Sequence, residues 1–393
     1  MVLNRKIKRD FRENFVRNGA MILIIALSMA MVVALCSSTE CITDAIMREW
    51  EQCCVEDGAF ETYAPLSKRN LNELSEINVS VEEMFYSDIS VNGGESVLRI
   101  FPERRYINTA FVEKGRMPEE KNEIFLEKNF ASNHNISVGD TIKAEGSTLT
   151  VSAVGCLPDY CCIRQNTSDV ASNDEFTVAV VRGADFDALC GNGKKIYNYA
   201  YRLGEGCTAR DLKNKLQRLK FDGAQIRDTY LKAHIGNGAM LQGTLSSFGE
   251  RQYNIRINNA IDDSKIGKQS ALVCGVILLI LLVYMLSIFA SGTIEKERPV
   301  IGTLYALGYT KKEILSHYMK TPLIISASGA VLGLLGGFAL TGGLTASYVA
   351  MYSFPEITRV YPPYLLAYAL GMPVIFSYFV NRYTLSKKLS AMP

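Results

Sequence analysis

Four apolar segments constrain the fold of this chain more than any other feature of its sequence. Residues 20–36, 271–290, 323–345 and 364–380 contain no charged side chain. Each has at least about 17 residues, the shortest helix that crosses the hydrocarbon core of a bilayer. Basic residues precede the first segment, but no small-residue cleavage site follows it, so we interpret it as a retained span. The sequence therefore predicts an α-helical membrane protein with four transmembrane helices.

The distribution of basic residues predicts how the chain is oriented in a cell membrane. Fifteen Lys and Arg residues lie outside residues 40–268; six precede the first span, five separate the second from the third, and three follow the fourth. Only Arg359 lies between the third and fourth spans. Because basic residues near span ends are retained in the cytoplasm, we expect both termini to be cytoplasmic and residues of about 40–268 to be extracytoplasmic.

Net charge separates the two sides of the membrane. Residues 40–268 carry 27 basic and 34 acidic residues, a net charge of −7, whereas the remainder carries +9. A nucleic-acid partner needs a basic surface, and the external segment offers none. Membrane topology and contact with anionic lipid explain the basic residues inside. We therefore expect the lipid bilayer, and no nucleic acid, among the partners.

The external segment has the pattern of an α+β domain inserted on helical stalks. Residues 37–56 and about 240–268 are polar or amphipathic and continue spans one and two, which predicts two stalk helices. Thr208 and Asp211 have capping-box spacing, which starts a helix over 208–220. Alternating apolar residues predict strands elsewhere. The predicted strands are a hairpin within 140–156 that turns near 145–147, and further strands at 175–181, 195–203 and 224–230.

Eight of the ten cysteines lie in this external segment. Eight cysteines can pair in 105 ways, so the sequence leaves open both the disulfide pattern and the alternative of unpaired thiols. Cys156, Cys161 and Cys162 have no His nearby and no second C-x-x-C pair, so we expect no metal site there. The external cysteines are Cys41, Cys53, Cys54, Cys156, Cys161, Cys162, Cys190 and Cys207.

Catalytic motifs are missing from the sequence. Residues 191–195 read GNGKK, but the first glycine and the Ser or Thr of a phosphate-binding loop are replaced, so we predict a turn. Neither H-E-x-x-H nor G-x-S-x-G occurs. We therefore expect a non-enzymatic protein with no cofactor of its own.

Residues 294–320 form the one substantial connection on the predicted inner side. Pro299 should end the helix that emerges from the second span. Gly308 should end the short helix that follows, and Thr310 with Glu313 should cap the next one. An amphipathic helix results, which rests on lipid or contacts another protein. Its apolar stripe comprises Val300, Ile301, Leu304, Tyr305 and Gly308.

Gly329, Gly333 and Gly337 recur every four residues in the third span. This spacing puts them on one helix face, where two backbones approach closely. The partner helix belongs either to the same protomer or to a second copy. Because the spans contain no charge, passage of an ion or small polar solute through them is disfavoured.

Two stretches carry a resemblance to a known family. ERPVIGTLYALGYTKKEIL, followed by SGAVLGLLGGFAL, resembles the FtsX-like permease domain of ABC transporters, the class of the MacB-like exporters and lipoprotein-releasing permeases. Residues 113–160 resemble the extracytoplasmic domain of this family, with the elements G-R-x-P, N-E-I, V-G-D-x-I and T-V-x-x-V in order.

The resemblance implies a permease subunit without its own ATPase. A separate cytoplasmic ABC ATPase would bind ATP and Mg²⁺ and dock on residues 294–320. The family often has an acidic residue at the position of Val300, so Glu295 or Glu297 would have to supply that charge here. The implied ATPase contacts are Ile301, Gly302, Leu304, Ala306, Leu307, Gly308, Lys311 and Ile314.

The predicted organisation is a cytoplasmic segment at 1–19, a span at 20–36, an extracytoplasmic domain with stalks at 37–268, and an FtsX-like permease domain at 269–393. The leading hypothesis is a permease that forms a dimer, either with a second copy of this chain or with a related chain. It would couple ATP hydrolysis to movement of the external domain, for export or extraction of an amphipathic substrate or control of an extracellular partner. The alternative is a membrane-anchored ligand sensor that signals to a separate effector. Substrate identity stays open, as does whether 393 residues form a whole subunit or half of a larger permease.

Overall fold

The computed structural model describes residues 12–390 apart from 92, 145, 146, 167, 172, 191–194 and 220–244. The chain divides into two compact units. The first, called the membrane unit below, comprises Met1–Ile42, Asp263–Ala346 and Thr358–Pro393. The second, called the β-rich unit, comprises Thr43–Asp262 and Ser347–Ile357.

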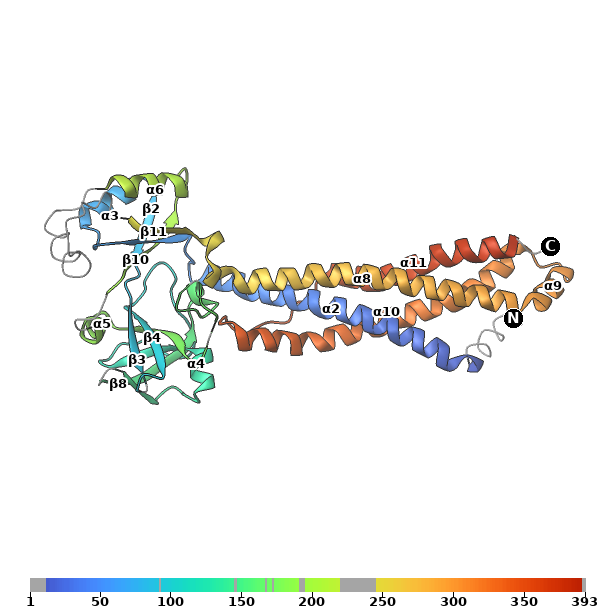
Figure 1. The fold of residues 1–393 in the computed structure, drawn as a ribbon, viewed down its shortest axis with the longest axis horizontal. Coiled ribbons are helices and arrows are strands. Elements are labelled where there is room, and N and C mark those ends of the chain that lie inside the picture. Colours follow the sequence, from blue (N-terminus) through green and yellow to red (C-terminus); the bar gives the residue numbers. More distant parts are fainter. Residues whose placement is uncertain are drawn as a thin grey trace. The chain divides into compact units, whose positions relative to one another are not determined.

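Within the part of the chain that the structure describes, four helices are long and apolar enough to cross a membrane. In the membrane unit they run alongside one another (Figure 1). Each contains one of the four predicted spans, so the predicted α-helical membrane architecture is confirmed. The helices are α2 (Phe15–Gln52), α8 (Ile255–Lys296), α10 (Lys311–Met351) and α11 (Pro363–Ser390).

A short helix, α9 (Arg298–Ala306), lies between α8 and α10 and begins and ends where the sequence predicts. Pro299 occupies its first turn, where a missing N–H costs nothing. Gly308 has φ +90°, a left-handed conformation that glycine adopts without a steric penalty. The Thr310 hydroxyl and backbone N–H both donate to the Glu313 carboxylate at 2.8 Å, as the predicted capping box requires.

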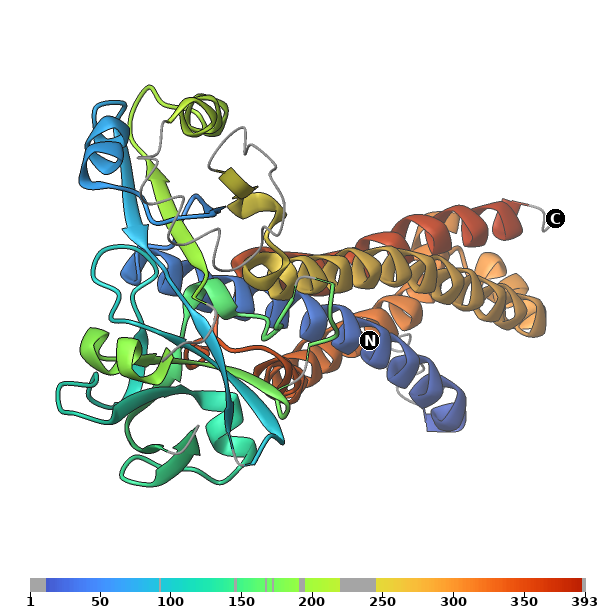
Figure 2. The same cartoon turned by 60° about the vertical axis from the view of Figure 1, so that its left-hand side comes forward.

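A four-stranded antiparallel sheet forms one part of the β-rich unit, with strand order β11-β1-β10-β2. Two helices, α3 and α6, lie on one side of it (Figure 2). They bury Leu74 and Leu212 against Phe60 and Tyr199 of the sheet. The bounds are β1 (Gly58–Thr62), α3 (Lys68–Ser75), β2 (Val79–Glu83), β10 (Tyr197–Leu203), α6 (Ala209–Arg218) and β11 (Leu245–Glu250).

This sheet tests three sequence predictions. The strand at 195–203 and the helix at 208–220 are confirmed by β10 and α6, and the latter is capped by Thr208 and Asp211. The stalk predicted from about residue 240 is wrong in its first part, because β11 pairs with β1 there and α8 begins only at Ile255. Leu245 and Phe248 pack against the core of the sheet, which favours a strand. The strand predicted at 224–230 lies outside the described residues.

Seven strands form a second, mixed sheet with the order β5-β8-β6-β9-β4-β3-β7. A further pairing of β7 with β8 closes six of these strands into a ring. The hairpin predicted within 140–156 and the strand predicted at 175–181 are confirmed. The bounds are β3 (Ser87–Val91), β4 (Ser96–Phe101), β5 (Phe111–Gly115), β6 (Glu123–Glu127), β7 (Thr141–Ala144), β8 (Ser147–Cys156) and β9 (Phe176–Val181).

Side chains on both faces of the second sheet are buried. One face contributes Ile100, Leu126 and Val151 to a core, and the other contributes Phe125 and Val178. No cysteine of the described residues forms a disulfide. The predicted turn at 191–195 lies largely outside the described residues. The remaining elements of this unit are α4 (Lys128–Asn133), η1 (Pro158–Tyr160), α5 (Gly183–Cys190) and η2 (Arg251–Tyr253).

Candidate functional site

The segment between α8 and α10 is fixed to the membrane unit by buried apolar side chains. Ile301 of α9 and Ile314 of α10 are 1% and 2% exposed. They share one cluster with Ile294 of α8 and with Leu385 and Leu389 of α11. Since burying such a side chain stabilises by about 1.5–3 kcal/mol, α9 is held by three of the long helices.

The other residues predicted to contact an ATPase differ in exposure. Leu304 is half-buried and packs against the same apolar cluster. Leu307, at the end of α9, is 71% exposed. The structure thus separates two buried anchors, Ile301 and Ile314, from an exposed rim. We define this rim as Gly302, Ala306, Leu307, Gly308 and Lys311, all of them exposed.

Polar contacts also hold this segment in place. Glu297, immediately before α9, accepts a hydrogen bond from the Tyr318 hydroxyl at 2.5 Å. Glu295 forms an ion pair with Lys388 of α11. These are the two carboxylates considered as substitutes for the acidic residue that is absent at Val300. Both already have a partner within the membrane unit.

The three predicted packing glycines lie against α2 of the same chain. A Cβ at Gly333 would lie 2.5 Å from the Cβ of Met29 and 2.8 Å from the carbonyl oxygen of Ala26. A Cβ at Gly329 would lie 2.7 Å from Ile25, and one at Gly337 would lie 2.5 Å from Val33. Real Cβ atoms do not come this close, so glycine permits the approach of α10 to α2. Of the two alternatives, packing within one protomer is the observed arrangement.

Residues Ser347–Ile357, which include the last turn of α10 and the start of the connection after it, belong to the β-rich unit. The predicted boundaries placed them in the permease domain. Phe354 is fully buried, and the Ser353 hydroxyl donates to Oε1 of Glu127 at 2.6 Å. The Ser353 N–H donates to the carbonyl oxygen of Cys161 at 2.7 Å. Sequence reasoning missed this docking, although the aromatic sequence YSF at 352–354 is an apolar signal in an otherwise short loop.

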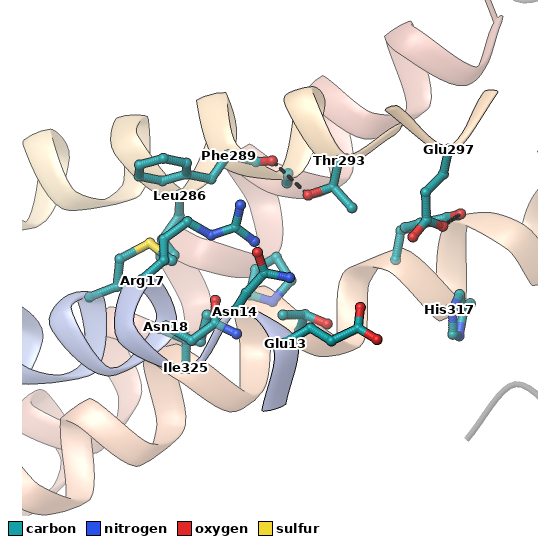
Figure 3. Close-up of a pocket in the computed structure, with 15 residues that line it drawn as sticks. Glu13, Asn14, Arg17, Asn18, Leu286, Phe289, Thr293, Glu297, His317 and Ile325 are labelled. Atoms are coloured by element: carbon teal, nitrogen blue, oxygen red, sulfur yellow. Dashed lines mark hydrogen bonds between the residues drawn. The ribbon is translucent and has the colours of Figure 1, made fainter. Parts of the chain in front are cut away.

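A pocket near the start of α2 was also not predicted. It has a volume of about 120 Å³ and lies between α2, α8 and α10 (Figure 3). Its polar lining includes Arg17 and Asn18 of α2, Glu297 and His317. Among the described residues, no three His, Cys, Asp or Glu side chains are arranged to hold a metal ion.

Comparison with protein families identifies the C-terminal part of the chain. Residues 271–388 match the family described as FtsX-like permease C-terminal. The chain carries an FtsX-like permease domain. The match includes the exposed rim, both buried anchors and the three packing glycines. The family match thus covers the C-terminal helices together with the segment that joins α8 to α10.

Other comparisons concern the whole chain. Among solved structures, the chain is similar to the periplasmic region of MacB from Actinobacillus actinomycetemcomitans. The two are 11% identical, with a TM-score of 0.27, and the match covers 41% of this chain and 79% of that chain. A comparison with curated proteins gave no match.

Proposed function

We propose that this permease subunit couples ATP hydrolysis by a separate cytoplasmic ATPase to movement of its β-rich unit. The ATPase, which would bind the ATP and Mg²⁺, would contact the exposed rim. One observation carries this proposal: the anchors Ile301 and Ile314 share an apolar core with α8, α10 and α11. Because packed cores deform little, a displacement of α9 would act on three spanning helices together.

The proposal includes an orientation in the cell membrane. Both termini and the rim would face the cytoplasm, and the β-rich unit would lie outside, as the distribution of Lys and Arg favours. A cysteine introduced at Thr310 should then be protected from an impermeant thiol reagent in intact cells, whereas one at the exposed Ser246 should react. Labelling at 310 from outside would contradict both the orientation and the docking role.

A second permease copy, identical or related, would complete the transporter. One face of α8 supports this, because several of its large apolar side chains are exposed within the single chain. Such a face needs lipid or another helix. The complete transporter would export or extract an amphipathic substrate, or control an extracellular partner. The face includes Ile277, Ile280, Leu281, Tyr284 and Ile288.

Leu307→Asp tests the docking of the ATPase. Leu307 is largely exposed, so the substitution should leave folding and membrane insertion intact. We expect Leu307 to be a hot spot of the interface, a class of residue that contributes about 2 kcal/mol or more, so affinity for the ATPase should fall by about 30-fold or more. Co-purification of the ATPase and its stimulated hydrolysis are the measurements.

Ser316→Asp is the matched control, because it adds the same charge at an exposed position of α10 outside the rim. It should bind the ATPase as the unmodified chain does. Unchanged affinity in Leu307→Asp would remove the docking role and favour the alternative of a membrane-anchored ligand sensor.

A further inference from the structure

The pocket between α2, α8 and α10 combines polar and apolar walls. Figure 3 shows Glu13 just before α2, and Arg17 and Asn18 in its first turn, between the ribbons of α8 and α10. Its volume of about 120 Å³ is several times the roughly 30 Å³ that one water occupies in the liquid. The pocket therefore has room for a chemical group larger than a single water.

Two buried polar atoms in this pocket have no hydrogen-bonding partner among the described residues. Asn18 is 2% exposed, and its Oδ1 receives no donor from residues 12–390 as far as these are described. The Nε of Arg17 is buried and has no acceptor among the same residues. The Arg17 guanidinium instead lies 5.5 Å from the ring centroid of Phe289. Since buried polar groups in folded proteins are normally paired, both atoms are available to pair with a ligand that enters the pocket.

The charges around these atoms define what that ligand must carry. Arg17 calls for an anionic acceptor, for which a phosphate oxygen is well suited. The Oδ1 of Asn18 can only accept, so it calls for an N–H or O–H donor. Glu13 and Glu297 also line the pocket. Their negative charge disfavours a purely anionic group and favours a cation beside the phosphate.

We propose that this pocket binds the phosphoethanolamine headgroup of a membrane phospholipid. Arg17 would bind the phosphate, and the primary ammonium would donate to Oδ1 of Asn18 with Glu13 beside it. Met21, Leu286 and Ile325 line the pocket too and offer apolar contacts for the first part of the acyl chains. A choline headgroup fits less well because its quaternary ammonium has no N–H to donate. This assignment depends on the pocket alone and not on the docking of an ATPase.

Lipid binding to the purified full-length chain tests the proposal. Native mass spectrometry would count bound phosphatidylethanolamine, phosphatidylcholine and phosphatidylglycerol with identical acyl chains. The unmodified chain should prefer phosphatidylethanolamine over both by about tenfold or more, as expected for a charge-assisted hydrogen bond. Arg17→Gln and Asn18→Leu should each reduce phosphatidylethanolamine binding by a similar factor.

Arg382→Gln is the control, because Arg382 is an exposed residue of α11 that donates to the Tyr378 hydroxyl and does not line the pocket. Its lipid binding should be unchanged. Circular dichroism would establish that each variant is folded. In a further variant, Glu13→Gln, the preference for phosphatidylethanolamine over phosphatidylcholine should decrease.

Three results would overturn the proposal. The first is equal binding of the three lipids, and the second is unchanged binding in folded Arg17→Gln and Asn18→Leu. The third is displacement of the lipid by inorganic phosphate as effectively as by glycerophosphoethanolamine, which would make the pocket a site for a free anion. Displacement by glycerophosphoethanolamine alone supports recognition of the whole headgroup.

Discussion

The two connections that flank α10 differ in how far their apolar residues are buried. Before α10, the segment with α9 leaves Leu307 71% exposed. After α10, Tyr352 and Phe354 are 3% and 0% exposed within the β-rich unit. Both connections contain apolar side chains, and exposing such side chains to water is energetically unfavourable. The apolar side chains of the connection after α10 are thus buried by the same chain, whereas Leu307 before α10 is left at the surface.

This difference assigns separate roles to the two ends of α10. The connection after α10 is fixed by Ser353, which bonds Glu127 and Cys161, and by Lys128, which bonds the carbonyl oxygen of Phe354 at 2.5 Å. It attaches α10 to the β-rich unit, in addition to the chain links through α2 and α8. The connection before α10 is anchored mainly by Ile301 and Ile314 beneath its rim, and the rim side chains are exposed and available to another protein. Three substitutions test this contrast.

The largest effect is expected for Phe354→Ala. Removing a fully buried phenylalanine typically costs about 3–5 kcal/mol, so the β-rich unit should unfold at lower denaturant concentration. Trp50 is the only tryptophan of the chain and belongs to this unit, so its fluorescence reports the transition. Tyr253→Ala is the control, because Tyr253 is 76% exposed in the same unit. Equal stability of the two variants would mean that the connection is not an anchor.

Ser353→Ala should have a smaller effect that depends on pH. The Glu127 carboxyl accepts the Ser353 hydroxyl and the N–H groups of Asn129 and Phe130. Burial nevertheless raises the pKa of Glu127 above its ordinary value, and loss of the hydroxyl should raise this pKa further. The substitution should cost about 0.5–1.5 kcal/mol while Glu127 is protonated and about 1.5–3 kcal/mol once it is charged.

The direction of this pH dependence follows from the number of protons that Glu127 binds in the folded and unfolded states. With a raised pKa, folded Glu127 binds more protons than unfolded Glu127, so its contribution to stability falls as pH rises above about 4.5. The difference between the unmodified chain and Ser353→Ala should therefore widen as the pH rises through the folded pKa of Glu127, which lies above its ordinary value. Unfolding of both proteins, followed by Trp50 fluorescence between pH 4 and 9, measures it. A difference that is constant with pH would show that the hydroxyl does not stabilise the charged carboxylate.

The third substitution, Gly333→Leu, acts on α10, the helix that joins the two connections. The new side chain would meet Met29 and the Ala26 carbonyl of α2. Such overpacking costs about 1–3 kcal/mol, so the chain should lose solubility in detergent at lower temperature. Gly343→Leu is the control on the same helix, because a Cβ there has no neighbour within 4 Å. A Gly333→Leu variant as stable as this control would contradict the close packing of α10 on α2.

Local signals in the sequence predicted much of the membrane unit. The spans follow from length and hydrophobicity, and the bounds of α9 follow from Pro299, Gly308 and the Thr310–Glu313 capping box. Each of these signals acts within a few residues, so the spacing of residues in the sequence is sufficient to predict the helix bounds. The spacing of the glycines in the third span predicted a close helix contact in the same way. It could not show that the contacting helix is α2, which contributes Ile25 and Met29.

The remaining features depend on residues that are distant in the sequence. Phe354 and Ser353 are more than 200 residues from Glu127, so no local pattern relates them. Likewise, Val300 and Ile301 belong to one apolar stripe, yet Ile301 is an internal anchor and Val300 is exposed. Periodicity gives each side chain a direction on its own helix. Burial requires a second surface, and that surface exists only once α8, α10 and α11 have packed around α9.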